Sequence, residues 1–186
     1  ISISHVSFIE VNTAYYSSYN ELFYTLNGGN DWAMLSTING AFMKFHFKNG
    51  STGWAVGCSG IRKTTNSGLN WVMLTPFLTS TGGNLSFINN QTGYTGSLKT
   101  TDAGDNWFNY APGVSSADGL YANYFLNENT GFITSHYFSY STGYNEIIYK
   151  TTNGGVNFYQ KLTAYNYWSS FSWFDFIDEM TGWAVG

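Results

Sequence analysis

The chain has 186 residues, of which 43% are hydrophobic and 20% aromatic, but only 10% are charged. Its formal net charge is −4 and its 7 basic residues are scattered along the chain, which excludes the basic stripe that neutralises a run of nucleic-acid phosphates. No apolar run reaches the roughly 18 residues of a membrane span, and the single cysteine, Cys58, excludes an internal disulfide. We therefore expect no nucleic-acid partner and no membrane insertion.

Short apolar segments recur along the chain, each followed by an anchor of the form Thr-Gly-aromatic. The apolar segments are 6–8, 45–47, 85–87, 124–126 and 174–176. The anchors are a degenerate Thr13-Ala14-Tyr15, then Thr52-Gly53-Trp54, Thr92-Gly93-Tyr94, Thr130-Gly131-Phe132 and Thr181-Gly182-Trp183. Their spacings of 39, 40, 38 and 51 residues indicate an internal repeat.

A second motif recurs along the chain, once after each of the first four anchors. It reads Thr, any residue, Asn or Asp, any residue, Gly, any residue, Asn or Asp, then Trp or Phe, and we call each copy a repeat turn. The four repeat turns are TLNGGNDW at 25–32, TTNSGLNW at 64–71, TTDAGDNW at 100–107 and TTNGGVNF at 151–158. Each repeat then reads as four short strands, A to D, with the turn between C and D; in the second repeat these are 41–48, 53–57, 61–65 and 70–74.

A period near 40 residues with four strands in each repeat predicts a single β-propeller segment of four-stranded antiparallel blades. The predicted blades cover approximately 1–39, 40–79, 80–116 and 117–168, and 169–186 holds only strands A and B of a fifth. We expect a fragment of a propeller of six to eight blades, with the remaining blades of the same parent chain as its neighbours. A compact four-bladed propeller is the alternative, which the unpaired fifth A and B strands disfavour.

The repeat turn resembles the Asp-box, or BNR repeat, of sialidase-type propellers. Together with TGWAVG and the following KTT, it is most similar to the photosystem II stability and assembly factor family and to related secreted bacterial proteins. The resemblance implies a structural role for the turns: the Asn or Asp oxygen accepts backbone N–H groups, the Gly takes a positive φ, and the aromatic ring packs between blades. The structural positions are Asn27, Gly29, Trp32, Asn66, Gly68, Trp71, Asp102, Gly104, Trp107, Asn153, Gly155 and Phe158.

A binding surface is expected at the opposite end of the blades, on the B–C and D–A loops. The fourth B–C segment, 134–144, is expanded, and the D–A connections at 76–83, 109–121 and 164–170 are long or irregular. Exposed rings provide contact area for sugars or side chains at little cost in entropy. The candidate ligand-binding residues are Tyr110, Tyr137, Phe138, Tyr140, Tyr144, Tyr165, Tyr167 and Trp168. Alternatively, these rings only extend a hairpin in an aromatic-rich chain.

The residue types in the sequence give little support to an enzymatic function. A sialidase needs several arginines to hold a carboxylate, and the chain has only Arg62. Xyloglucan hydrolases among BNR-like propellers use two carboxylates across a cleft, and the only local acidic cluster is Asp175, Asp178 and Glu179. The three histidines lack the spacing of metal ligands, and three of the four repeat turns carry a neutral Asn. We therefore predict no catalytic residues, no metal and no cofactor.

These observations favour a non-enzymatic, secreted or cell-surface bacterial propeller. It would serve recognition or adhesion by binding a glycan or protein through its B–C and D–A loops. Two alternatives remain open. One is a glycoside-hydrolase propeller whose catalytic carboxylates lie outside this segment, and the other is a protein-assembly scaffold factor.

Overall fold

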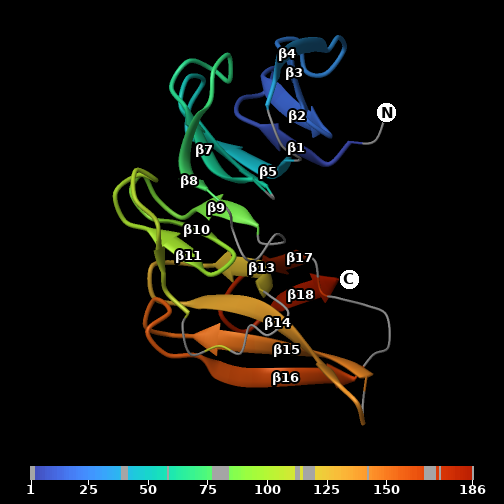
Figure 1. The fold of residues 1–186 in the computed structure, drawn as a ribbon, viewed down its shortest axis with the longest axis vertical. Coiled ribbons are helices and arrows are strands. Elements are labelled where there is room, and N and C mark those ends of the chain that lie inside the picture. The colour runs from blue at the N-terminus through green and yellow to red at the C-terminus, as the bar shows by residue number, and fades with distance from the viewer. Residues whose placement is uncertain are drawn as a thin grey trace. The chain divides into compact units, whose positions relative to one another are not determined.

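A computed structural model of the chain describes residues 3–38, 42–57, 59–76, 84–111, 114, 120–141, 143–165, 171 and 173–185; Cys58 lies outside them. Every regular element in these ranges is a β-strand (Figure 1). Within them, no segment forms a long apolar helix of the kind that crosses a bilayer. The chain divides into two compact units, Ile1–Leu78 and Thr79–Gly186, which are described separately.

The first unit contains two antiparallel four-stranded sheets, each in simple up-and-down order. The first sheet consists of β1 (His5–Phe8), β2 (Ala14–Ser18), β3 (Glu21–Thr25) and β4 (Ala33–Thr37). The second consists of β5 (Phe42–Phe47), β6 (Gly53–Gly57), β7 (Gly60–Thr64) and β8 (Val72–Pro76). Their core joins side chains of both sheets, with Tyr15 stacked on Phe47 at 4.2 Å between ring centroids.

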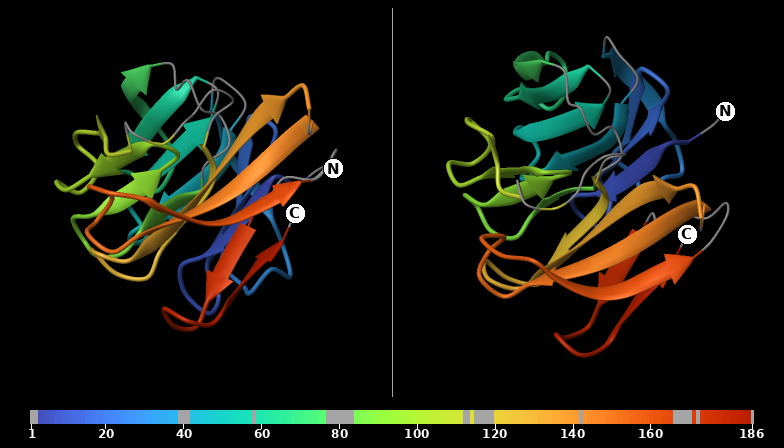
Figure 2. Two further views of the ribbon diagram at one scale, coloured as in Figure 1. Left: turned by 90° about the horizontal axis from the view of Figure 1, so that it is seen from below. Right: turned by 60° about the horizontal axis from the view of Figure 1, so that its bottom comes forward.

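The second unit contains two further four-stranded sheets and a two-stranded one. The third sheet consists of β9 (Leu85–Phe87), β10 (Gly93–Thr95), β11 (Leu98–Thr100) and β12 (Phe108–Asn109). The fourth consists of β13 (Leu120–Phe125), β14 (Gly131–Ser139), β15 (Gly143–Thr151) and β16 (Tyr159–Tyr165). The fifth is the pair β17 (Trp173–Phe176) and β18 (Gly182–Val185), which lies beside β13 (Figure 2).

The strand order of the four-stranded sheets confirms the predicted all-β blades, with strands A to D in each and only A and B in the fifth. The bounds of three predicted strands of the second blade differ: strand A spans 42–47 rather than 41–48, strand C spans 60–64 rather than 61–65, and strand D spans 72–76 rather than 70–74. Strand D of the second blade begins at Val72 rather than at residue 70, because Trp71 still belongs to the turn and donates its indole N–H to Gly68 O (2.9 Å).

The glycine of each Thr-Gly-aromatic anchor makes room for a ring of the neighbouring A strand. Gly53 is the cross-strand partner of Phe47, and a Cβ on Gly53 would lie 2.6 Å from Phe47 Cδ1. The rings of Phe87, Phe125 and Phe176 cover the equivalent glycines in the same way. The degenerate first anchor fits this reading: Ala14 stands opposite Phe8, and the Phe8 side chain is exposed.

Each repeat turn is closed by one threonine and one Asn or Asp. In the second turn, Thr64 Oγ1 donates to Asn66 Oδ1 (3.0 Å) and accepts from Gly68 N (3.0 Å). Asn66 Oδ1 also accepts from Asn70 N (2.9 Å). The same three bonds recur in the other turns at 2.8–3.1 Å. This confirms the predicted role of the Asn or Asp side chain and adds a role for the threonine.

The turn glycine has a positive φ and lies against the preceding blade of its unit. Gly68 has φ +87°, and a Cβ there would lie 2.8 Å from Leu22 Cδ2 and 3.1 Å from Leu35 Cδ2. A Cβ on Gly155 (φ +93°) would overlap the ring of Tyr110. Gly29 in the first turn has nearly the same φ, +92°, but its Cβ would meet only its own Trp32 at 3.7 Å.

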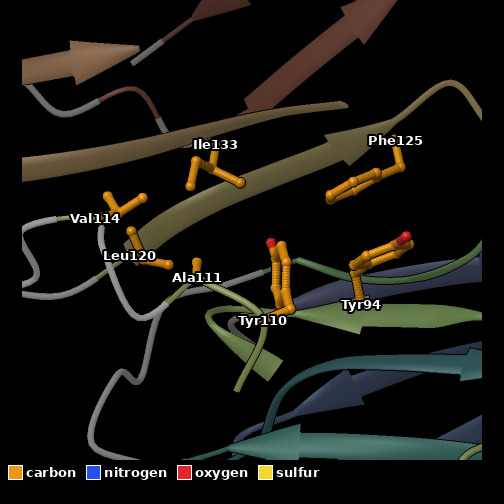
Figure 3. Packing of buried hydrophobic residues seen from close by; sticks show 7 residues of the cluster. All are labelled: Tyr94, Tyr110, Ala111, Val114, Leu120, Phe125 and Ile133. Carbon is orange, nitrogen blue, oxygen red and sulfur yellow. The ribbon is translucent and has the colours of Figure 1, made fainter. Parts of the chain in front are cut away.

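Tyr110 belongs to the core of the second unit (Figure 3). Its ring is packed edge-on against Tyr94 (5.3 Å), and Tyr94 stacks on Phe125 at 3.6 Å. Leu120, Ile133, Ala111 and Val114 complete the cluster. The third and fourth blades are therefore joined by a layer of aromatic rings.

The repeat turn of the third blade carries the only Asp among the four third positions. Asp102 Oδ1 accepts from Asn106 N (2.9 Å) and from Thr100 Oγ1 (2.8 Å), and Oδ2 accepts from Asn106 Nδ2 (2.7 Å). These hydrogen bonds, those from Asn106 foremost, lower the pKa of the carboxyl to about 2. Because the charged form is stabilised only in the folded turn, the bonds favour folding at pH values where Asp102 is ionised.

We expect Gly68→Ala to lower the free energy of unfolding more than Gly29→Ala does. Both variants force alanine into a left-handed conformation, which costs about 1 kcal/mol. Only Gly68→Ala also drives a methyl group into the leucines of the preceding blade, which adds about 1–3 kcal/mol. Urea unfolding of both variants, which alter the same unit, measures the difference; equal losses would contradict the packing role of Gly68.

We expect Asp102→Asn to change the pH dependence of stability. The folded pKa is depressed, so the contribution of the Asp102 carboxylate is complete above its ordinary pKa and is lost as pH falls towards 2. The stability difference between wild type and variant should therefore shrink as urea unfolding is repeated from pH 6 down to pH 2. Other carboxylates, such as Asp178, titrate in both proteins and cancel. A difference independent of pH would refute the assignment.

Candidate functional site

The two ends of each blade differ in how they are closed. A backbone bond from the repeat turn to the A–B turn recurs in all four complete blades: Gly28 N to Asn12 O, Ser67 N to Ser51 O, Ala103 N to Gln91 O and Gly154 N to Asn129 O, at 2.8–3.0 Å. The A–B and repeat turns are thus tied together, and the B–C turns lie at the opposite ends of the strands. This confirms the predicted division of loops within each blade.

The repeat-turn end is built for structure. The oxygens of Asn27, Asn66, Asp102 and Asn153 face N–H and O–H groups of their own turns. In the parts of the chain that the structure describes, no group of three or more His, Cys, Asp or Glu residues is placed to hold a metal ion. What the turns do chemically is satisfy backbone donors that the chain reversal leaves without strand partners.

Two acidic residues of the fifth blade also accept hydrogen bonds that stabilise a turn. Asp178 Oδ1 accepts from Met180 N and Thr181 N, both at 2.7 Å, and so closes the A–B turn. Glu179 Oε1 accepts from Thr130 Oγ1 of the fourth blade (3.2 Å), and its backbone O accepts from Lys150 Nζ (3.2 Å). Asp175 lies mid-strand in β17, opposite Trp183. Asp178 and Glu179 therefore fix a turn and dock it on the neighbouring blade.

The fourth blade carries a B–C hairpin that is longer than the others. Strands β14 and β15 have nine residues each, whereas the B and C strands of the other complete blades have three to five. Their pairing continues in unbroken register from Gly131 opposite Thr151 to Ser139 opposite Gly143. Burial changes along β14: residues 131–135 are buried, and residues from 136 onward are half-buried or exposed. The outer half of the hairpin therefore extends into solvent.

The tip of this hairpin presents two of the predicted rings. Tyr140 is fully exposed at 101% and Phe138 is 50% exposed. The two rings lie edge to face, with centroids 5.5 Å apart and planes at 81°. The Ser139 and Ser141 hydroxyls, which flank Tyr140 in the chain, are 3.0 Å apart, and Gly143 takes φ +73°. The tip is thus a locally ordered aromatic surface without a charged group.

The other predicted ligand-binding residues fall into different environments. Tyr137 is half-buried on β14. Tyr144 and Tyr165 lie on β15 and β16, with their side chains outside the described part of the structure. Tyr167 and Trp168 lie outside the described residues altogether. The structure therefore brings Phe138 and Tyr140 together at the hairpin tip.

The prediction for Tyr110 is wrong. Tyr110 is only 6% exposed, and its hydroxyl donates to Gly96 O (3.3 Å) within the core. The physical reason is that β12 ends after two residues, so the chain folds Tyr110 back over Gly155 instead of carrying it into a loop. Burial and the neighbouring Tyr94 raise the pKa of the Tyr110 phenol.

The sequence held a signal for this packing. Tyr110 stands three residues after the aromatic Trp107 of its turn, and Leu35 stands three residues after Trp32. Both side chains lie against the glycine of the next repeat turn, at Gly155 and Gly68. The position therefore contributes to the contact between blades.

Sequence reasoning also missed a pocket of about 450 Å³ in the second unit. It is lined by Ala111, Val114, Tyr149, Gly155, Val156, Asn157, Phe158 and Tyr159. Tyr159 is 55% exposed at its rim, and burial raises the pKa of Tyr149. Its volume is within the range of small-ligand sites. It could not be anticipated because the repeat turn, β15 and β16 of the fourth blade meet the segment after β12 only in the fold.

A buried carboxylate was missed as well. Glu146, on β15, is 5% exposed, and both of its oxygens accept from Phe171 N at 2.6 Å. Burial raises the pKa of Glu146, against the opposing effect of the bond from Phe171. The side chain anchors the segment that leads into β17, and its oxygens are turned to the backbone rather than to a cleft.

Comparison with known proteins identifies the fold. No family model matches the sequence, and no curated protein matches it. Among solved structures, an ancestral GH74 enzyme is similar over 86% of this chain, with a TM-score of 0.66 and 20% identity. YCF48 from Cyanidioschyzon merolae is similar over 97% of this chain, with a TM-score of 0.66 and 13% identity. The N-terminal domain of Nup159 is similar over 86%, with a TM-score of 0.57 and 11% identity.

This chain covers only part of each of those proteins: 25% of the GH74 enzyme, 62% of YCF48 and 47% of the Nup159 domain. At these identities the likeness concerns the fold. Together with the antiparallel four-stranded sheets, it shows that the chain is built as blades of a β-propeller.

Proposed function

We propose that the protein is a non-enzymatic recognition propeller, secreted or displayed on a bacterial cell surface, that binds a glycan or a protein through its B–C and D–A loops. The contact surface on which this proposal rests is the tip of the β14–β15 hairpin. The observation that carries it is the exposure of Tyr140 and Phe138 on a hairpin about twice as long as its counterparts.

Exposed aromatic rings on a paired hairpin offer contact area to a ligand. Burying Tyr140 and Phe138 against a ligand would recover apolar area, and each ring loses little conformational entropy on binding. The residues of the tip, 137–143, carry no formal charge. A neutral surface of rings and hydroxyl groups suits the faces of sugar rings or an apolar and aromatic stretch of protein, rather than a strongly charged partner.

The alternatives rest on fold likeness alone. A glycoside-hydrolase propeller remains compatible with the likeness to an ancestral GH74 enzyme, and an assembly factor with the likeness to YCF48. Within the described residues, Asp178, Glu179 and Glu146 already hold turns and backbone. A hydrolytic function would therefore need other carboxylates, which this alternative places outside the segment.

We expect Tyr140→Ala and Phe138→Ala each to weaken ligand binding about tenfold, which corresponds to ~1.4 kcal/mol. A glycan array tests the carbohydrate class, and selection from a random-peptide display library tests the protein class. Phe8→Ala, which removes an exposed ring at the A–B end of the first blade, is the matched control and should leave binding unchanged.

Tyr159→Ala distinguishes the hairpin tip from the pocket. If only Tyr159→Ala weakens binding, the ligand occupies the pocket of the second unit and the assignment to the hairpin is wrong. If no glycan and no selected peptide binds in a manner that depends on Tyr140 or Phe138, recognition by this surface is refuted.

A further inference from the structure

The turn glycine carries a backbone acceptor that two blades pair with an indole. In the second turn Trp71 Nε1 donates to Gly68 O (2.9 Å), and in the third turn Trp107 Nε1 donates to Gly104 O (3.1 Å). Both glycines are buried, and both rings are half-buried. Because a buried carbonyl group needs a donor, the tryptophan of the motif contributes a hydrogen bond as well as packing.

The fourth turn lacks this donor. Its aromatic residue is Phe158, whose ring has no N–H, although Gly155 is buried like its counterparts. Tyr110 packs over Gly155, but its hydroxyl donates to Gly96 O (3.3 Å). Among the hydrogen bonds of the described residues, none is made to Gly155 O. The fourth turn therefore holds a buried acceptor that its own motif leaves without a partner.

The preceding blade does not replace the donor. At the second turn, Ser36 Oγ of the first blade also donates to Gly68 O (2.7 Å). Ser36 stands four residues after the aromatic residue of its own turn, and the residue at that position of the third blade is Ala111. Both donors found at the second turn are thus apolar side chains at the fourth: Phe158 replaces Trp71, and Ala111 replaces Ser36.

The acceptor and both substituted residues lie in the wall of one pocket. Gly155, Phe158 and Ala111 line the cavity of about 450 Å³ in the second unit, together with Tyr149 and Val114. Aromatic and aliphatic walls beside a backbone acceptor suit a flat apolar ring that carries a donor. The indole that occupies the second and third turns is a ring of this kind.

We propose that this pocket is a binding site for an indole group. The bound ring would pack against Phe158 and Tyr149 and donate its N–H to Gly155 O, which would supply from a ligand the bond that the second and third turns make within the chain. The site lies between two complete blades. It is independent of the ligand proposed for the β14–β15 tip, because no residue of 137–143 lines the pocket.

The test is the binding of 5-fluoroindole to the 186-residue chain, measured by fluorine NMR. We expect saturable line broadening, and affinity about two- to tenfold lower for 5-fluoro-1-methylindole, which has no N–H to donate. Phe158→Trp should abolish binding, because the new side chain brings the ring and the donor that Trp71 and Trp107 provide. Phe8→Trp adds the same ring at an exposed position of the first blade, and as the matched control it should leave binding unchanged.

Ala111→Ser separates hydrogen bonding from packing. The serine hydroxyl would donate to Gly155 O, as Ser36 does to Gly68 O, while the pocket keeps its room for a ring. We therefore expect 5-fluoroindole to lose its advantage over the methylated compound in this variant. Urea unfolding should show Phe158→Trp and Ala111→Ser at least as stable as the wild type, since each restores a hydrogen bond of the second turn.

Competition against 5-fluoroindole distinguishes two sources of the indole group. Displacement by both 3-methylindole and N-acetyltryptophanamide would assign the pocket to a tryptophan side chain of a protein, and displacement by 3-methylindole alone would assign it to a free indole compound. Absence of saturable binding, equal affinity for the methylated compound in the wild type, or binding that survives Phe158→Trp would overturn the proposal.

Discussion

The structure depends on one buried hydroxyl group in each repeat turn. Thr25, Thr64, Thr100 and Thr151 are 0–1% exposed, and each accepts from the backbone N–H of the turn glycine while donating to the Asn or Asp two residues on. A buried donor left without an acceptor costs about 1–3 kcal/mol. The hydroxyl therefore holds the glycine in its left-handed conformation, and that conformation lets the backbone approach the preceding blade. Turn geometry and packing between blades thus share one cause.

The periodic part of this design could be predicted from the sequence. The strands, their order and the turn hydrogen bonds follow from local patterns, because each pairs residues at most 20 positions apart. Where prediction failed, the cause was contact between repeats. Tyr110 is buried by Gly155, 45 positions away, and the pocket beside Tyr159 includes Ala111 and Val114 of the preceding blade. The long hairpin that carries Phe138 and Tyr140 was predicted because its extra length can be read from the spacing of the repeats.

The blades use different ends for different purposes. The carboxylates of turn residues such as Asp102 and Asp178 accept hydrogen bonds from backbone N–H groups of their own turns. At the opposite ends the chain is free to vary, since a B–C hairpin can lengthen without disturbing the strands that pack in the core. The β14–β15 hairpin shows this freedom: its inner residues keep the pairing and burial of a blade, while Ser139 to Ser141 form a surface of their own.

The lysine opposite the B-strand ring of the third and fourth blades has an evolutionary consequence. Lys99 Nζ also donates to Gly154 O of the following blade (3.2 Å), and Lys150 Nζ donates to Glu179 O of the blade after that. The third and fourth repeats thus each carry a cation for the blade that follows, whereas the first repeat has Tyr24 at the position of the lysine. A gene duplication that copies the fourth repeat would insert a unit that brings both the cation for its next neighbour and the carbonyl acceptor for its previous one. Such a repeat can be gained or lost without a compensating substitution for this bond.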